Sequence, residues 1–184
     1  MHIKFLKYYH FINKYDLNHL ESLDSNIHII YRNYNHIIDI SEILKIRSIC
    51  RRKGNKFYIS NNFKLCIKLN LDGVYIPSFN KDTNFNCFSI KKNFKIIGSA
   101  HNRHEINFKL RQNVNEIFIS SIFKKNSNYL GIYNFLSLKK FNSVKTIALG
   151  GINSSNLKKV NLTGALGISG IEYFKKKGPL KKGP

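Results

Sequence analysis

The sequence predicts an α/β protein that folds as a single compact (β/α)8 TIM barrel with a short or missing last helix. Three observations support this: short β-type runs alternate with helical segments, eight such runs can be counted, and 184 residues suit one domain. The alternation indicates parallel strands joined by helical crossovers. Because an open doubly wound sheet rarely needs eight strands, a closed barrel is preferred. Such barrels typically take about 250 residues, so the loops and the last helix must be minimal.

Eight apolar runs rich in Ile, Phe and Tyr are the expected strands: residues 7–12, 27–32, 56–60, 73–76, 95–99, 116–120, 146–149 and 165–168. Helices are expected at residues 16–23, 39–51, 63–69, 103–111, 131–140 and 154–160. The segment 39–51 has apolar residues at the i, i+3, i+4 spacing of one helix face, and Gly54 stands where a C-terminal cap belongs. Residues 77–93 are the least regular stretch, and with them the chain has the seven crossovers that eight strands need.

The formal net charge of +21 is the most prominent feature of the composition. Clustered Lys and Arg can indicate a nucleic-acid partner, because they release counterions from phosphate backbones. Here the positive charge is mostly Lys, is spread along the whole chain, and comes with abundant Asn, Ile, Phe and Tyr, as an A/T-rich coding sequence would produce. We therefore favour a solvated basic surface over a nucleic-acid interface, and expect its field to attract small anionic substrates.

The three cysteines, Cys50, Cys66 and Cys87, lack the CxxC spacing of a zinc or redox site. We interpret them as small apolar residues of a protein in the reducing cytoplasm. No stretch approaches the roughly 20 apolar residues of a membrane-spanning helix, and the first residues lack a signal-peptide pattern. We expect a barrel domain over residues 1–174 and a lysine-rich tail over 175–184. The sequence leaves open whether copies of the chain form a homo-oligomer.

The sharpest local signal is the Gly150–Gly151 pair, which follows the apolar run 146–149 and precedes a helical segment. Glycines let a backbone approach an anion closely, and the free N–H groups of a helix start stabilise negative charge. In barrels, phosphate sites lie after the last two strands. The alternative for an isolated Gly pair is a tight turn that binds nothing.

Seven segments give this pair a context: Ile30–Tyr34 (IYRNY), Phe57–Asn62 (FYISNN), Leu71–Ser78 (LDGVYIPS), Ile96–Glu105 (IIGSAHNRHE), Glu116–Lys125 (EIFISSIFKK), Ile147–Asn153 (IALGGIN) and Thr163–Ile171 (TGALGISGI). In these segments, in their order and spacing, the chain resembles the thiamine phosphate synthase/TenI family. The resemblance implies a (β/α)8 barrel and small phosphorylated substrates. It also implies a transferase of thiamine biosynthesis that joins an aminopyrimidine diphosphate to a thiazole phosphate and expels pyrophosphate through a dissociative, carbocation-like step.

The resemblance further implies site residues. The implied catalytic residues are Arg32, which would face the diphosphate, Asn61, and His101 at the pyrimidine edge. Implied substrate-binding residues are Ser60, Ser99, Ser120, Ser121, Gly150, Gly151, Gly170 and Ile171. Asn61 and Asn80 stand where the family has its metal-binding aspartates, so an implied Mg2+ cofactor would lie there. Glu172 stands where the family has a phosphate-binding serine.

Two other functions stay open. A TenI-like thiazole tautomerase would need a proton-transfer residue, for which His101 is the best candidate, and a protein of this type could also bind a phosphate ligand without catalysis. A basic nucleic-acid-binding protein on a barrel scaffold is the alternative from another class, although no basic stripe interleaved with aromatic residues is found.

Overall fold

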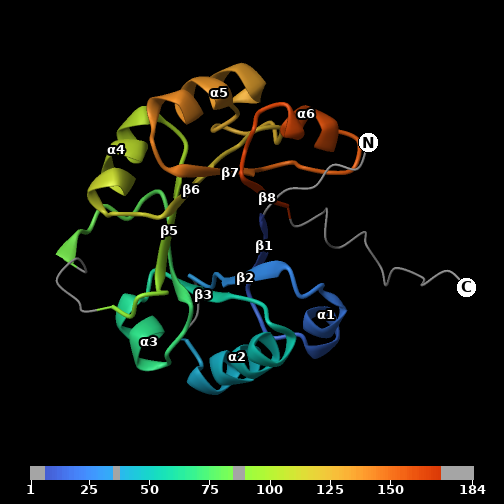
Figure 1. Cartoon of the computed structure of the whole chain (residues 1–184), viewed down its shortest axis with the longest axis vertical. Helices are drawn as coiled ribbons and strands as arrows, with labels where there is room; N and C mark the ends of the chain where they lie inside the picture. The colour runs from blue at the N-terminus through green and yellow to red at the C-terminus, as the bar shows by residue number, and fades with distance from the viewer. Residues whose placement is uncertain (1–6, 35–37, 85–89, 171–184) are drawn as a thin grey trace, which may run out of the picture.

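The computed structural model describes residues 7–34, 38–84 and 90–170, and shows a closed barrel of parallel strands surrounded by helices (Figure 1). The strands pair in chain order, and β8 returns to pair with β1, where Lys7 lies opposite Gly167. This confirms the predicted (β/α)8 barrel. Residues 171–184 lie outside the described residues, so the predicted tail at 175–184 stays a prediction.

The eight strands are β1 (Lys7–Ile12), β2 (Ile27–Tyr31), β3 (Phe57–Ser60), β4 (Gly73–Ile76), β5 (Lys95–Ala100), β6 (Glu116–Ile119), β7 (Lys145–Leu149) and β8 (Gly167–Ser169). The helices are α1 (Leu17–Ser22), α2 (Ile40–Lys53), α3 (Phe63–Lys68), α4 (Arg103–Arg111), α5 (Gly131–Phe141) and α6 (Leu157–Asn161). Each expected strand and helix is present, most within two residues of the predicted bounds. The predicted helix at 154–160 starts later, because the Asn153 side chain accepts hydrogen bonds from Ser155 and Asn156 and holds a turn there.

Helix α2 shows why local sequence and structure agree. The Asp39 side chain accepts the Ser41 N–H at 2.8 Å, which satisfies a free donor of the first turn. The helix ends at Gly54, whose φ of 77° is the left-handed conformation that glycine adopts without steric cost. Ile43 and Ile46 are fully buried against the outer face of the barrel, as the predicted apolar face requires.

The interior of the barrel is filled mainly by aromatic rings. A separate buried cluster consists of Tyr9, Phe11, Ile30, Tyr58, Tyr75, Ile97, Phe118 and Ile147. The rings meet edge to face: the Tyr9 and Phe118 centroids lie 4.9 Å apart, and those of Phe11 and Tyr75 lie 5.2 Å apart. Such pairs stabilise each other beyond their buried area. We call these eight side chains the aromatic plug, because they fill the barrel between its two ends.

A buried carboxylate joins strands across the amino end of the barrel. Glu116 is 1% exposed, and its carboxylate accepts a hydrogen bond from Tyr9 Oη at 2.5 Å and another from Lys7 Nζ. Lys95 Nζ lies 3.4 Å away. Burial by itself would raise the pKa of Glu116, but the hydrogen bonds from Lys7 and Tyr9 and the lysine charges outweigh burial and lower the pKa below its usual value.

The crossover from β4 to β5 has no α-helix among its described residues, and a buried lysine of α4 supports it instead. Lys109 is fully buried, and its Nζ donates to Pro77 O and Asn80 O at 2.7 Å and to Gln112 Oε1 at 2.8 Å. Gln112 Nε2 in turn donates to Asn80 O at 3.0 Å and Asp82 O at 2.8 Å. Burial lowers the pKa of Lys109 to about 8. Two polar side chains thus hold a loop that lacks regular structure of its own.

Replacing Glu116 by Gln is expected to lower the free energy of unfolding at pH 7 by about 2 kcal/mol, measured by urea denaturation, because Lys7 and Tyr9 lose a charged acceptor. The pKa of Glu116 is lowered in the folded state, so its contribution is present above the ordinary carboxyl pKa. It is lost as pH falls through the folded-state pKa, and the two proteins should converge in acid. Glu21→Gln, at an exposed ion pair with Arg52, is the control expected to change little. A Glu116→Gln deficit unchanged by acid would contradict the assignment.

Lys109→Met should accelerate amide hydrogen exchange in residues 77–84 and lower the free energy of unfolding by about 1–3 kcal/mol, because three acceptors lose their donor. In the wild type, the folded state releases the Lys109 proton near pH 8 and the unfolded state near 10.5, so Lys109 makes stability rise with pH across this window. The variant should lack this rise. Lys64→Met, on the exposed face of α3, is the matched control. Equal exchange in both variants would show that Lys109 does not hold the loop.

Candidate active site at the carboxyl end of the barrel

The predicted site residues lie at one end of the barrel. Five of them directly follow the last residue of a strand: Arg32 after β2, Asn61 after β3, His101 after β5, Ser120 after β6 and Gly150 after β7. Because all eight strands are parallel, these positions share the carboxyl end, where barrel enzymes hold their substrates. Of the predicted residues, Ile171 lies outside the described residues, as does Glu172.

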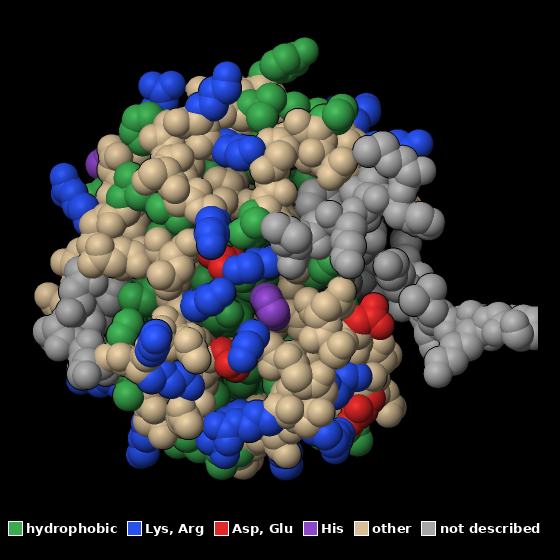
Figure 2. All heavy atoms as spheres, viewed as in Figure 1, with side chains coloured by type: hydrophobic (Ala, Val, Ile, Leu, Met, Phe, Trp, Pro, Cys, Tyr) green, Lys and Arg blue, Asp and Glu red, His purple; other side chains and the backbone are tan. Residues whose placement is uncertain are grey.

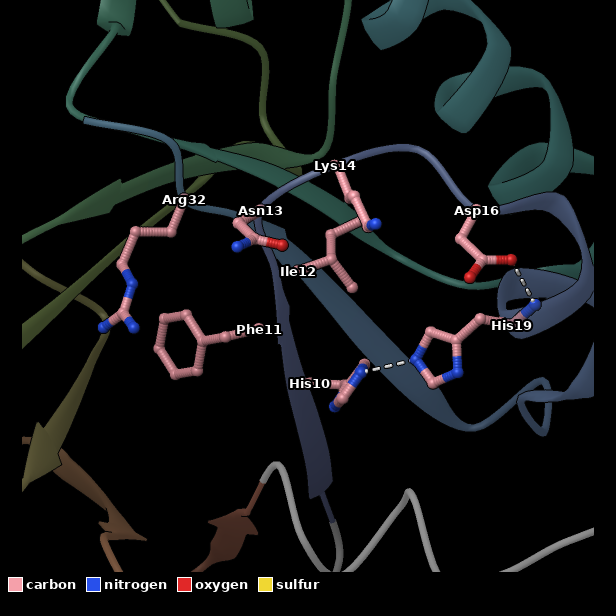
Figure 3. A pocket seen from close by; sticks show the side chains of 8 residues that line it. All are labelled: His10, Phe11, Ile12, Asn13, Lys14, Asp16, His19 and Arg32. Carbon is pink, nitrogen blue, oxygen red and sulfur yellow. Dashed lines mark hydrogen bonds between the residues drawn. The ribbon is translucent and has the colours of Figure 1, made fainter. Parts of the chain in front are cut away.

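Arg32 lies at the rim of a cavity of about 360 Å3 beside β1 (Figure 3). Its N–H donates to Ile12 O at 2.7 Å, which extends the β1–β2 ladder and fixes the backbone. Its guanidinium carbon lies 4.9 Å from the centroid of the Phe11 ring, so the ring orients the cation. No carboxylate of the described residues forms an ion pair with Arg32, which leaves its donors available for an anionic ligand.

The same cavity is lined by a histidine pair that the sequence did not indicate. His10 is buried, and its Nε2 atom lies 2.7 Å from Nε2 of His19, so that one ring donates and the other accepts (Figure 3). Asp16 caps α1 by accepting the His19 N–H at 3.0 Å. The two histidines belong to β1 and α1, which precede all the segments on which the site prediction rested.

Ser60, Asn61 and Asn80 are brought together as predicted, but in a closed arrangement. Asn80 Nδ2 donates a hydrogen bond to Asn61 Oδ1, so the two amides satisfy each other. Asn61 adopts a φ of 59°, and its N–H donates to Tyr75 O at 2.8 Å, which fixes the turn after β3. Ser60 Oγ donates to the Tyr34 hydroxyl at 3.1 Å. The pair depends on the Lys109 contacts described above, since Lys109 holds the Asn80 backbone.

His101 is oriented by a carboxylate. Glu105 Oε2 accepts the His101 backbone N–H at 2.7 Å and lies 2.9 Å from His101 Nδ1. With Nδ1 directed at a carboxylate, the neutral ring carries its proton on Nδ1 and leaves Nε2 as an acceptor. This is the arrangement of a side chain that can exchange a proton with a ligand. Ser99, two residues earlier, accepts a hydrogen bond from Tyr75 Oη at 2.8 Å inside the barrel.

The Gly pair after β7 packs against the loop after β6. A Cβ atom on Gly150 would lie 2.4 Å from Ser121 Oγ, and one on Gly151 would lie 2.5 Å from Lys124 N. Gly150 O accepts the Phe123 N–H at 2.9 Å. Ser121 Oγ donates to Lys124 O at 2.9 Å and so shapes the same loop. The glycines are therefore required first for contact between two loops of the chain itself.

The same arrangement leaves hydrogen-bond donors beside β7 without a protein acceptor in the described residues. Within the described residues, no hydrogen bond is donated by the N–H groups of Gly150 or Gly151 to a protein acceptor. Ser120 Oγ likewise has no partner in the described part of the chain, and Ser120 is buried. On the neighbouring strand, Ser169 Oγ donates to Tyr9 O at 2.9 Å, and Gly170 is buried next to it. Two backbone donors and a hydroxyl are thus available beside β7, as the phosphate prediction requires.

No group of three or more His, Cys, Asp or Glu side chains is placed to hold a metal ion within 7–34, 38–84 and 90–170. In these same ranges, no helix has both the length and the apolar character needed to cross a membrane.

The side chains that hold the predicted site residues in place were not themselves predicted. Glu105, Tyr34 and Tyr75 each fix a predicted residue, and none was assigned a role in advance. For Glu105 a signal existed: it follows His101 by four residues, the spacing at which helical side chains meet. For Tyr34 and Tyr75 no signal existed, because their partners come from other strands.

Comparison with known proteins finds similarity to one family. The family model described as thiamine monophosphate synthase matches residues 29–174. The thiamine-phosphate synthase of Pelagibacter ubique is 34% identical over 141 residues, covering 72% of this chain and 67% of that protein. The enzyme of the same name from Prochlorococcus marinus (strain AS9601) is 29% identical over 133 residues, covering 68% of this chain. The chain spans only 37% of the length of this Prochlorococcus relative.

Solved structures agree on the fold. A thiamine phosphate pyrophosphorylase from Pyrococcus furiosus superposes with a TM-score of 0.70 at 19% identity, covering 90% of this chain and 85% of that chain. One from Bacteroides thetaiotaomicron gives a TM-score of 0.62 at 17% identity, covering 92% of this chain and 94% of that chain. At these identities the likeness establishes the barrel alone.

Gly150→Ala is expected to lower the free energy of unfolding by about 3 kcal/mol or more, because the added Cβ meets Ser121 and the φ of 102° strains any side chain. Gly54→Ala is the matched control: its φ is 77°, yet nothing lies within 4 Å of its added Cβ. That variant should lose only about 1–2 kcal/mol from the left-handed conformation. Chemical denaturation of both variants measures the difference, and equal losses would show that loop packing at Gly150 is unimportant.

Proposed function

The chain belongs to the thiamine monophosphate synthase family, and we propose that it is a transferase that joins an aminopyrimidine diphosphate to a thiazole phosphate with release of pyrophosphate. The observation that carries the proposal is a pair of features at one end of the barrel that are suited to anions. Among the residues that the structure describes, the Arg32 guanidinium after β2 has no carboxylate partner, and the Gly150 and Gly151 N–H groups after β7 have no protein acceptor. Two phosphorylated substrates need two such features.

In the proposed reaction, the C–O bond between the pyrimidine methylene and the diphosphate breaks, and both electrons leave on pyrophosphate. The thiazole nitrogen then donates its lone pair to the same carbon and forms the C–N bond. Arg32 would stabilise the charge that develops on the leaving diphosphate, and the glycine amides would hold the thiazole phosphate. Ser60, Ser99, Ser120 and Ser121 would contribute hydroxyl groups to the pocket wall. A dissociative step of this kind needs positioned cations and donors more than a general base.

A resident Mg2+ does not fit the residues at the position that the resemblance implies. Asn61 and Asn80 are neutral and hydrogen-bonded to each other, whereas Mg2+ in proteins is held by carboxylates, phosphates and water. The nearby Asp82 accepts the Asn84 N–H at 2.8 Å and is the only acidic residue in the sequence from 77 to 94. We therefore assign no step of the reaction to a protein-bound metal.

A second candidate function rests on the His101–Glu105 pair. A histidine oriented by a carboxylate at the carboxyl end of β5 could transfer a proton on a bound thiazole phosphate, as a TenI-like tautomerase would require. In that case the phosphate would still occupy the Gly150 corner, and Arg32 would be dispensable. The proposed setting for either reaction is the reducing cytoplasm, where the buried thiols of Cys50 and Cys66 stay reduced.

Arg32→Ala should reduce kcat/KM for pyrophosphate release from the two phosphorylated precursors by about 100-fold, because it removes the cation that faces the leaving group. Assays are run with and without Mg2+ and follow both pyrophosphate and thiamine phosphate. Arg52→Ala, at an exposed ion pair on α2, is the matched control and should keep full activity. No turnover by the wild type, together with no complementation of a synthase-deficient strain, would refute the synthase proposal.

Replacing Glu105, which orients His101, distinguishes the two candidate functions. If the protein is a synthase, Glu105→Gln should lower kcat less than tenfold, since no proton transfer limits the reaction. If it is a tautomerase, the same change should cost about 100-fold or more and alter the pH profile, because the imidazole loses its orienting carboxylate. Proton exchange of a thiazole phosphate into D2O, followed by NMR, measures the second activity directly.

A further inference from the structure

The amino end of the barrel, opposite the candidate active site, contains a basic cavity. In Figure 1 the helices follow one another clockwise in chain order. With right-handed crossovers, the helices of a barrel follow counterclockwise when it is viewed from the carboxyl ends of its strands. Figure 1 therefore views the barrel from the amino end. Figure 2 shows the same face, with Lys and Arg side chains gathered around a central hollow and acidic and histidine side chains among them. The cavity measures about 500 Å3, and Lys56, Lys92, Lys95 and Lys145 line it.

The carboxylates at this cavity do not balance its lysines. Glu116 already accepts a hydrogen bond from Lys7 and lies 3.4 Å from Lys95. Asp72 accepts the Phe57 N–H and Lys56 Nζ, both at 3.0 Å. Lys92 and Lys145 are exposed, and neither forms an ion pair with an acidic side chain in the described ranges. With Lys7 counted, five ammonium groups surround two carboxylates, which leaves an excess of three positive charges.

The lysine charges contribute to lowered pKa values of two neighbouring groups. The pKa of His28, which lines the cavity, is lowered to about 4, first by burial and then by the charges of Lys7, Lys95 and Lys56, while Glu116 opposes the shift. Burial also lowers the pKa of Lys7, with Lys95 adding to the effect against the opposing pull of Glu116. In addition, His28 Nδ1 is buried without a hydrogen-bond partner among the described residues. A site that disfavours further positive charge and contains an unsatisfied polar atom is suited to an anion.

Polar and aromatic side chains complete the lining. Asn115 Oδ1 accepts the Ile96 N–H at 2.8 Å, which leaves the Asn115 amide NH2 group to donate elsewhere. Asn93 also lines the cavity, together with the rings of Tyr58 and Phe94. Tyr58 belongs to the aromatic plug, which fills the barrel between this cavity and the carboxyl end. The basic cavity is therefore separate from the candidate active site.

We propose that this cavity is a second binding site, which takes a small anion carrying two or three linked phosphate groups. The excess of three charges matches a diphosphate or triphosphate rather than a single phosphate. The concave shape distinguishes the site from lysines scattered over a convex surface, where solvent screens each charge. Both an inorganic polyphosphate and the phosphate chain of a nucleotide offer this chemistry. The proposal is independent of the reaction at the opposite end.

The test measures binding of tripolyphosphate, pyrophosphate and ATP by isothermal titration calorimetry at 150 mM salt. The key variant is Lys92→Gln/Lys145→Gln, which removes two lysines without an acidic partner in the described structure and so should leave folding intact. Lys64→Gln/Lys68→Gln on α3 removes the same charge from an exposed helix face and is the matched control. We expect at least a tenfold loss of tripolyphosphate affinity in the cavity variant and none in the control.

Arg32→Ala separates the two ends of the barrel, since a diphosphate could also bind at the candidate active site. Retention of tripolyphosphate affinity in Arg32→Ala supports the basic cavity, and its loss there would overturn the proposal. Equal weakening in the cavity variant and the control would show diffuse surface charge and would also overturn it. So would absence of binding at millimolar tripolyphosphate, or displacement of tripolyphosphate by a short single-stranded RNA that binds more tightly.

A second readout requires no substitution. Ligand phosphates beside His28 should raise the pKa of this histidine, so its ring NMR signals should shift and titrate at higher pH when tripolyphosphate is added. The signals of His104, on the exposed face of α4, serve as the internal reference. Tighter binding of ATP than of tripolyphosphate would identify a nucleotide as the natural source, and the reverse order would identify an inorganic polyphosphate. A His28 signal that is indifferent to both would overturn the proposal.

Discussion

The packing of large aromatic rings inside an eight-stranded barrel is the constraint on which the rest of the structure depends. The strands are three to six residues long, so few side chains are available to fill the interior. Tyr9, Tyr58, Tyr75, Phe11 and Phe118 supply the volume that more numerous aliphatic residues supply in longer barrels. Each buried phenol needs a polar partner, and these partners lie toward the ends: Tyr75 reaches Ser99, and Tyr9 reaches Glu116. The plug thereby fixes one residue of the candidate active site and the carboxylate beside the basic cavity.

Because the chain is short for an eight-stranded barrel, buried polar side chains take the place of regular structure in one crossover. The β4–β5 crossover shows no α-helix in its described part, and Lys109 of α4 and Gln112, which follows α4, satisfy the carbonyls of Pro77, Asn80 and Asp82. A buried ammonium group is costly unless it is hydrogen-bonded, and Lys109 has three acceptors. The same contacts set the position of Asn80, which pairs with Asn61. The use of side-chain hydrogen bonds in place of a helix therefore shapes the candidate site, because this loop cannot move without breaking buried hydrogen bonds.

The sequence was sufficient for the barrel and for placing the predicted site residues at one end of it, since both follow from short-range patterns. Alternating apolar runs and helical spacing gave the strands, and residues that follow parallel strands must share one end. The contacts could not be predicted in the same way. Gly150 and Gly151 indicated close approach, but the partner they approach is the Ser121–Lys124 loop, which only the closed barrel brings near. The Asn61–Asn80 bond and the role of Lys109 depend on side chains from three different crossovers, and no local pattern encodes such a meeting.

The two ends of the barrel differ in how they use charge, and this difference bears on function. At the carboxyl end, Arg32 and Lys14 line one cavity, and neither forms an ion pair with a carboxylate within the described residues. Glu105 is engaged in orienting His101, so the proposed anion recognition there would rely on these cations and on backbone donors. Such a site suits ligands whose charge changes during a reaction, because positioned donors stabilise the new charge without rearrangement. At the amino end, many lysines converge on a fixed carboxylate and leave a permanent positive excess. A permanent excess favours retention of an anion over its conversion, which is why we assign chemistry to the first end and binding alone to the second.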